Sequence, residues 1–199
     1  LNALNQETIN ELKVCFEFIK SNTENKYGII ITGSGEKAFV AGADIKEFNK
    51  IDESSSSVFC NNGHSLFNLI ENMSIPVFAL VNGYALGGGC ELSLACHFRI
   101  ATENAQFSQP EINLGLIPGY GGTQRLTQII GKTKALEMML TANMISSKEA
   151  LDYGLVNYVV KDFDSGMEKC KEYISTIKRK APVAIKNVIK SVNNFYTND

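Results

Sequence analysis

The chain has 199 residues, of which 44% are hydrophobic, and this composition fits one ordinary globular domain with a core of its own. Its formal net charge of -2 argues against a general nucleic-acid binder, because phosphate contacts need a surplus of basic residues on one face. Five cysteines without a Cys-x-x-Cys pair and two histidines predict neither a zinc site nor a disulfide framework, so we expect no metal.

The sequence also lacks the usual signs of membrane insertion or export. No apolar run approaches the roughly 20 residues that span a bilayer, and no signal-peptide pattern opens the chain. We therefore expect a cytoplasmic protein without a membrane partner.

The first half of the chain alternates between predicted helices and strands. Apolar residues at helical spacing follow Asn5, a suitable N-cap, and predict an amphipathic helix of about four turns. A buried strand is expected over 27–35, where three isoleucines run into glycines. The serine-rich stretch 52–57 is expected to be a mobile surface segment, with apolar periodicity resuming at Phe59.

The second half becomes mostly helical. A second apolar run, 75–89, is expected to form a strand that ends in glycines and leads into a helix, and residues 98–101 a third strand. After Pro118 the pattern is helical, with a long final segment over 164–195. Strands followed by helices indicate an α/β core and then a helical region.

A glycine-rich turn between a strand and a helix is the first candidate site. Gly87, Gly88 and Gly89 bring backbone N–H groups and the positive end of a helix to one point, where a developing oxyanion could be held. Glu91 lies in the first turn of that helix. Two simpler interpretations stay open: a tight connection between elements, and a glutamate that only stabilises the helix dipole.

A second candidate carboxylate is Glu111, which follows Pro110 in a stretch whose prolines and glycines would fix a loop. Glu91 and Glu111 are 20 residues apart with a predicted strand between them, so both could return to the same end of a sheet. The alternative is a plain glutamate at the start of a short helix begun by Pro110.

Other motifs fit poorly. Residues 33–38 match the loose dinucleotide pattern Gly-x-Gly-x-x-Ala, but the expected helix does not follow. A phosphate-binding loop before Lys132 fails because Leu126 stands where its first glycine is required. No Gly-x-Ser-x-Gly elbow exists, and neither His64 nor His97 has an evident Ser or Cys partner in sequence.

Three segments in order closely resemble the enoyl-CoA hydratases of the crotonase superfamily, and among these the bacterial short-chain members. They are KAFVAGADIKEF (37–48), NGYALGGGCELSLAC (82–96) and AQFSQPEINLGLIPGYGGTQRL (105–126). The resemblance implies an α/β fold with a crotonase-like ββα superhelix core followed by a helical C-terminal region. It implies a single crotonase-like domain over 1–199, without the N-terminal strand and last C-terminal helices of full-length relatives.

The resemblance also implies the site. The family's two catalytic glutamates fall on Glu91 and Glu111, and its two oxyanion-hole amides are placed by motif on Ala41 and Gly88. The expected substrate-binding residues are Ala41, Gly42, Ala43, Asp44 and Gly88. No metal and no separate cofactor are expected, since CoA is part of the substrate.

The implied activity is the reversible syn addition of water to a short trans-2-enoyl-CoA, such as crotonyl-CoA. Glu111 would exchange the proton at C2 and Glu91 would activate water. The partners that the resemblance implies are the acyl-CoA and further copies of the chain, as a trimer or hexamer. The alternatives are an enoyl-CoA isomerase, a hydratase of another acyl-CoA, and a non-catalytic binding module, against which the retained glutamates and the acidic charge argue.

Overall fold

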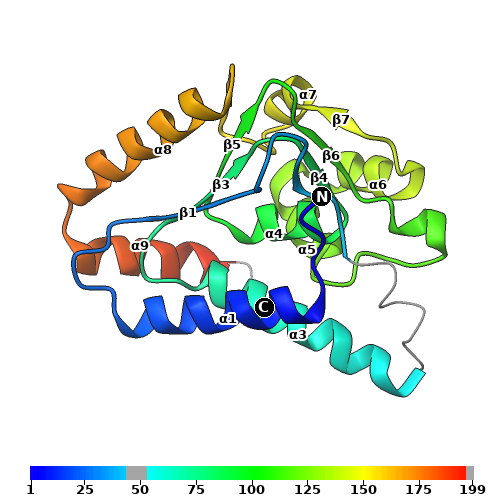
Figure 1. Ribbon diagram of the computed structural model, residues 1–199, viewed down its shortest axis with the longest axis horizontal. Coiled ribbons are helices and arrows are strands. Elements are labelled where there is room, and N and C mark those ends of the chain that lie inside the picture. Colours follow the sequence, from blue (N-terminus) through cyan, green and yellow to red (C-terminus); the bar gives the residue numbers. More distant parts are fainter. Residues whose placement is uncertain (44–52, 196–199) are drawn as a thin grey trace.

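Two four-stranded sheets form the centre of the described part of the molecule (Figure 1). The computed structural model describes residues 1–43 and 53–195, with the backbone alone over 53–59. The first sheet is parallel, in the order β1(Ile29–Thr32), β3(Val77–Val81), β5(Phe98–Thr102) and β8(Tyr158–Val160). The second has the order β2(Ala38–Val40), β4(Tyr84–Leu86), β6(Gln106–Ser108) and β7(Ile145–Ser146), of which β7 is antiparallel.

The chain visits these sheets alternately. The strand pairs β1–β2, β3–β4 and β5–β6 each place one strand in the first sheet and the next in the second. Helices α3(Glu53–Glu71) and α4(Gly88–Ala95) follow the first two of these pairs. This repeated strand–strand–helix order is the expected ββα core, so the predicted fold class is confirmed.

The helices cover the sheets and fill the space between them. All residues of α4 are buried, and α4 packs against β2, β4, α3 and α5(Gly122–Ile130). Helix α1(Gln6–Ser21) lies beside α3 (Figure 1). The remaining α-helices of the described residues are α6(Lys132–Thr141), α7(Ser147–Asp152), α8(Phe163–Lys178) and α9(Pro182–Phe195).

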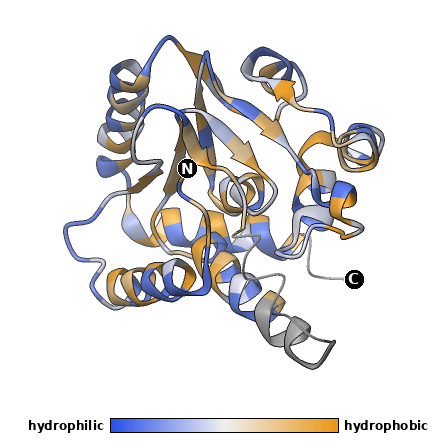
Figure 2. Cartoon of the chain, turned by 45° about the vertical axis from the view of Figure 1, so that its right-hand side comes forward, coloured by the Kyte–Doolittle hydropathy of each residue, from blue (hydrophilic) through white to orange (hydrophobic). Residues whose placement is uncertain are grey.

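Hydrophobic residues lie in two layers. On one side of the first sheet, α8 packs Cys170 against Phe78, Leu80 and Ile100. The larger cluster fills the space around α4, and the outer helices show hydrophilic and hydrophobic sides (Figure 2). No helix within 1–43 and 53–195 is long and apolar enough to cross a membrane.

The structure contains four strands that were not predicted, β2, β6, β7 and β8, and it differs from two of the predicted segments. The run 75–89 is not one strand: it divides into β3 and β4, because buried Asn82 donates hydrogen bonds to the carbonyls of Gly33 (3.0 Å) and Gly35 (2.7 Å) and so fixes the crossing between the sheets. Helix α3 already begins at Glu53, within the serine-rich stretch. Asp52, the first residue of the serine-rich stretch, lies outside the described residues.

The close approach of α4 to β2 depends on Gly89. A Cβ atom at this position would lie 2.0 Å from the Val40 carbonyl oxygen, so a side chain there requires the helix and strand to separate. Gly89→Ala should lower the free energy of unfolding by about 3 kcal/mol and Tm by roughly 10 °C, measured by calorimetry. Gly119→Ala is the matched control, because its Cβ would lie an ordinary 3.5 Å from Cys60 Sγ. Equal Tm values for both variants would contradict this packing constraint.

Candidate active site

The two glutamates singled out from the sequence follow neighbouring parallel strands. The last residue of β4, Leu86, pairs with the last residue of β6, Ser108. The N–H of Gly87 extends this pairing by donating to the Ser108 carbonyl (2.9 Å). Since the carboxyl ends of parallel strands meet at one edge of a sheet, α4 and the short 3-10 helix η1(Glu111–Leu114) begin close together. The structure therefore brings Glu91 and Glu111 to the same end of the second sheet.

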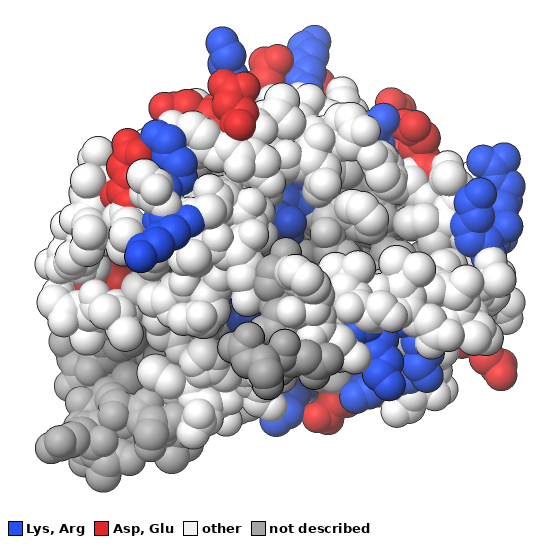
Figure 3. Space-filling view, turned by 180° about the vertical axis from the view of Figure 1, so that it is seen from behind, with Lys and Arg blue, Asp and Glu red and all other residues white. Residues whose placement is uncertain are grey.

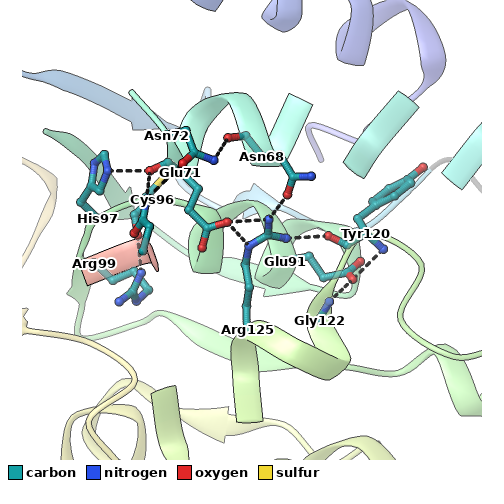
Figure 4. A network of polar contacts seen from close by, with 11 residues as sticks. Asn68, Glu71, Asn72, Glu91, Cys96, His97, Arg99, Tyr120, Gly122 and Arg125 are labelled. Carbon is teal, nitrogen blue, oxygen red and sulfur yellow. Dashed lines mark hydrogen bonds and ion pairs between the residues drawn. The ribbon is translucent and has the colours of Figure 1, made fainter. Parts of the chain in front are cut away.

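Glu91 is buried and held by backbone amides. Its side chain is in the first turn of α4, and the residue is 1% exposed. The Oε1 atom accepts hydrogen bonds from the N–H groups of Tyr120 (2.8 Å) and Gly122 (2.7 Å), just before and at the start of α5 (Figure 4). Because both donors bind Oε1, Oε2 is the oxygen available to take a proton from a reactant.

The protonation of Glu91 is shifted into the neutral range. Burial raises its pKa to about 7, and the nearby charge of Glu111 acts in the same direction. The N–H groups of Gly122 and Tyr120 and the charge of Arg125 oppose this rise. A carboxyl group with such a pKa can act as either acid or base near neutral pH.

Glu111 faces the glycine turn from the other side. Its Oε1 lies 2.5 Å from the position that a Cβ on Gly87 would take, so only glycine leaves room for the carboxylate. With its amide nitrogen turned toward the carboxylate, Gln109 donates to Oε2 (3.1 Å) and Oε1 (3.3 Å) of Glu111. Glu111 is half-buried, and burial raises the pKa of its carboxyl group.

Gly88 fits the predicted oxyanion donor. It is the first residue of α4, where the helix has no carbonyl to receive its N–H, and the Tyr120 ring lies 3.3 Å from the position of a Cβ on Gly88. A carbonyl oxygen placed here would meet the positive end of the helix.

Ala41, the second predicted donor, does not fit. Its N–H donates to the Leu1 carbonyl (3.1 Å), which leaves no free hydrogen for a thioester oxygen. Ala43, two residues later, fits better. It is bridged in parallel to Leu4 through the Gly42 carbonyl, which directs the N–H of Ala43 away from Leu4. The Ala43 nitrogen is 3.7 Å from the Cβ position of Gly88.

Of the other two predicted substrate-binding residues, Gly42 and Asp44, the structure describes only Gly42. Gly42 has a φ of 123° and adjoins the Leu86 carbonyl, so it lies beside the glycine turn. Asp44 lies outside the described residues.

Residues that the sequence interpretation did not single out complete the site. They are Tyr120 and Gly122, whose amides hold Glu91, together with Gln109 and Arg125. The signal was the glycine-rich stretch 119–122 directly before a helix. A segment of this composition predicts exposed amides, but the sequence does not say which carboxylate they meet.

The other titratable side chains have structural roles or lie apart. His97 accepts the Val77 N–H at Nδ1 (2.8 Å), so its Nε2 carries the hydrogen that reaches the Glu71 carbonyl (3.0 Å). The dinucleotide-like residues 33–38 lead into β2 and not into a helix. Within 1–43 and 53–195 no three His, Cys, Asp or Glu side chains are placed to hold a metal ion.

Comparison with known proteins identifies the family. The model of the enoyl-CoA hydratase/isomerase family matches residues 1–199. The chain belongs to this family. It is 44% identical over 193 residues to the short-chain-enoyl-CoA hydratase of Clostridium acetobutylicum, covering 97% of this chain and 73% of that protein.

Two further relatives agree with this assignment. The crotonyl-CoA hydratase of Syntrophomonas wolfei is 43% identical over 186 residues, covering 94% of this chain and 71% of its own length. The crystal structure of the enoyl-CoA hydratase from Bacillus anthracis superposes with a TM-score of 0.93 at 39% identity, covering 99% of this chain and 76% of that one. The family that the three sequence segments resemble is therefore confirmed.

The raised pKa of Glu91 links its ionisation to stability. The pKa of Glu91 is about 7 in the folded protein, above the ordinary 4.5, so folding favours the protonated carboxyl group. The contribution of this group to the free energy of unfolding is fully present below pH 4.5 and is lost as pH rises through 7. Gln cannot ionise, yet its side-chain oxygen can still accept both amides. Glu91→Gln should therefore raise Tm over wild type at pH 8 by on the order of 5 °C, with little difference at pH 4.

The comparison uses Tm of both proteins across this pH range. An exposed glutamate, Glu137, serves as the control, and Glu137→Gln should change Tm little at either pH. A Glu91→Gln difference that is the same at pH 4 and pH 8 would show that Glu91 does not ionise with a raised pKa.

Proposed function

We propose that this chain catalyses the reversible syn addition of water to a short trans-2-enoyl-CoA, with crotonyl-CoA as the substrate and 3-hydroxybutyryl-CoA as the product. The observation that carries the proposal is the meeting of two carboxyl groups, Glu91 and Glu111, at a helix N-terminus that offers the amide of Gly88. The names of the relatives from Clostridium acetobutylicum and Syntrophomonas wolfei support the short acyl chain.

The backbone supplies the electrophilic part of the mechanism. The thioester oxygen would accept hydrogen bonds from the N–H groups of Gly88 and Ala43, and these bonds strengthen as negative charge moves onto that oxygen. One such donor typically lowers the barrier by about 3 kcal/mol, or roughly a hundredfold in rate. Polarisation in this direction withdraws electron density from C3 and makes it open to attack by water.

The two carboxyl groups divide the proton transfers. Glu91, with Oε1 held by two amides, uses Oε2 to take a proton from the water that attacks C3. Glu111 exchanges the proton at C2. Because burial raises both pKa values and the two charges repel, a state with one proton shared between the groups is favoured near neutral pH. Because the carboxyl groups that activate water and donate the C2 proton lie together, the hydroxyl group and the proton are expected to add to the same face of the double bond.

The proposal also covers cofactors, assembly and cellular location. It requires no separate cofactor or metal, since CoA enters as part of the substrate and the amides polarise the thioester. Exposed apolar residues of η1, the following loop and α6 support a homo-oligomer, a trimer or hexamer: Ile112, Leu114, Ile117, Leu136 and Leu140. We place the reaction in the cytoplasm, in fatty acid or butanoate metabolism.

Two alternatives differ in product or in chemistry. A double-bond isomerase would use the same two glutamates to move a proton, and only the product distinguishes it. A nucleic-acid-binding module finds little support in the charges: Lys178, Arg179 and Lys180 are exposed at the end of α8, but the formal net charge is -2 and Figure 3 shows both acidic and basic side chains on the face that it draws.

The direct test is the loss of conjugated enoyl-thioester absorbance when the protein is mixed with crotonyl-CoA. Wild type should consume the substrate, with 3-hydroxybutyryl-CoA as the product. Glu111→Gln and Glu91→Gln should each lower kcat by at least about a hundredfold, because each removes one proton-transfer group and leaves the amides in place. Binding of crotonyl-CoA, measured by calorimetry, should change little.

The control is Glu137→Gln, which alters an exposed carboxylate of α6 and should keep wild-type turnover. Turnover near wild type in both active-site variants would overturn the proposed mechanism. Turnover with long trans-2-enoyl-CoAs only would overturn the short-chain assignment, and conversion of 3-enoyl to 2-enoyl thioesters without hydration would identify an isomerase.

A further inference from the structure

Arg125 lies directly behind the loop that holds Glu91. It is in α5 and is 6% exposed. Its Nη1 donates to the Tyr120 carbonyl (3.0 Å), and its Nη2 donates to Asn68 Oδ1 (2.6 Å) and Glu71 Oε2 (2.8 Å). Its Nε also donates to Glu71 Oε2 (3.1 Å), so one guanidinium joins α5, the loop and α3 (Figure 4).

The geometry connects this guanidinium to the catalytic carboxylate through a very short stretch of backbone. Tyr120 gives its carbonyl to Arg125 and its N–H to Glu91, and the second donor to Glu91 is Gly122. Between them, Gly121 has a φ of 98°, and a Cβ on it would lie 2.4 Å from Arg125 Nη1. The planar guanidinium thus lies against Gly121 and holds the peptide unit between Tyr120 and Gly121, which lies between the two peptide units whose N–H groups converge on Glu91 Oε1.

The charges around Glu91 come from several elements. Arg125 in α5 stabilises the ionised carboxylate and thereby lowers its pKa, while Glu111 in η1 raises it. Burial raises the pKa of the Cys60 and Cys90 thiols, and the charge of Glu91 acts in the same direction. Burial lowers the pKa of His64, and the Arg125 charge adds to that shift. Glu71, with its side chain 32% exposed, partly neutralises Arg125. The ion pair therefore sets how much positive charge reaches Glu91.

We propose that Arg125, oriented by Glu71 and Asn68 of α3, is a positioning residue that holds the amides of Tyr120 and Gly122 on Glu91 and so controls the proton transfer between Glu91 and water. The proposal rests on the hydratase function proposed above. A purely structural role, in which the ion pair only joins α3 to α5, is the competing explanation. It predicts a change in stability without a specific change at Glu91.

The experiment combines two variants with opposite effects on the charge near Glu91. Arg125→Gln removes the positive charge and should raise the pKa of Glu91, whereas Glu71→Gln leaves Arg125 uncompensated and should lower it. The pKa is measured by carboxyl ¹³C NMR on ligand-free protein with labelled glutamate, with the Glu91 resonance assigned by its loss in Glu91→Gln.

Kinetics provide the second measurement. Arg125→Gln should lower kcat for crotonyl-CoA by about tenfold to a hundredfold while KM stays within roughly threefold, because the base is displaced and the acyl-CoA contacts are not. Arg125→Lys keeps the positive charge but cannot reproduce the planar set of guanidinium donors. Compared with Arg125→Gln, it should therefore return the pKa of Glu91 closer to the wild-type value than it returns kcat. Lys134→Gln breaks an exposed ion pair with Glu137 and is the matched control, with no change in either quantity.

The outcomes separate the explanations. A folded Arg125→Gln protein with wild-type kcat and an unchanged Glu91 pKa would overturn the proposal. If Arg125→Gln does not fold, Glu71→Gln decides by the same measurement, and an unmoved Glu91 pKa overturns it. Should the wild-type protein hydrate no enoyl-CoA, the proposed function fails, while the NMR titrations in ligand-free protein still decide whether Arg125 positions Glu91.

Discussion

The burial of one carboxylate is the constraint on which the site depends. A carboxyl group that is 1% exposed loses its hydration, and this loss must be offset by donors that the fold provides. For Glu91 these donors are two backbone N–H groups from a loop 29 and 31 positions further along the chain. That loop needs glycine at its centre and a guanidinium behind it. Glu91, the loop, α5 and the end of α3 therefore form one connected arrangement.

The alternation of strands between two sheets explains how distant residues reach this arrangement. Strands β4 and β6 end at the same edge, so the residues that follow them, the glycine turn and η1, come together without any long connection. A third segment reaches the turn from β2, after which Gly42 and Ala43 approach Leu86 and Gly88. Each segment arrives at the end of a strand of the second sheet, which makes that edge the point where the substrate thioester is expected.

The sequence was informative where local pattern decides structure. The glycine turn before a helix, the carboxylate in its first turn and the α/β order could be predicted because each depends on neighbouring residues. The division of 75–89 into two strands could not, because it depends on Asn82 contacting a turn 47 and 49 positions away. The same reason applies to Ala41 and Ala43: their motif is clear, but the direction of each N–H is set by pairing with residues 1–4. Arg125 carries no local signal, because the residues that it contacts in α3 lie 54 and 57 positions away in the chain.

The three consecutive glycines at the start of α4 have a consequence for how this sequence can vary. A methyl group at Gly87 would meet the Glu111 carboxylate, one at Gly88 the Tyr120 ring, and one at Gly89 the Val40 carbonyl. These neighbours belong to three separate segments, so no single compensating substitution can make room for more than one of the three side chains. A triplet under such independent restrictions offers almost no neutral path for mutation, and its codons should be among the least tolerant of change in a saturation scan of the gene.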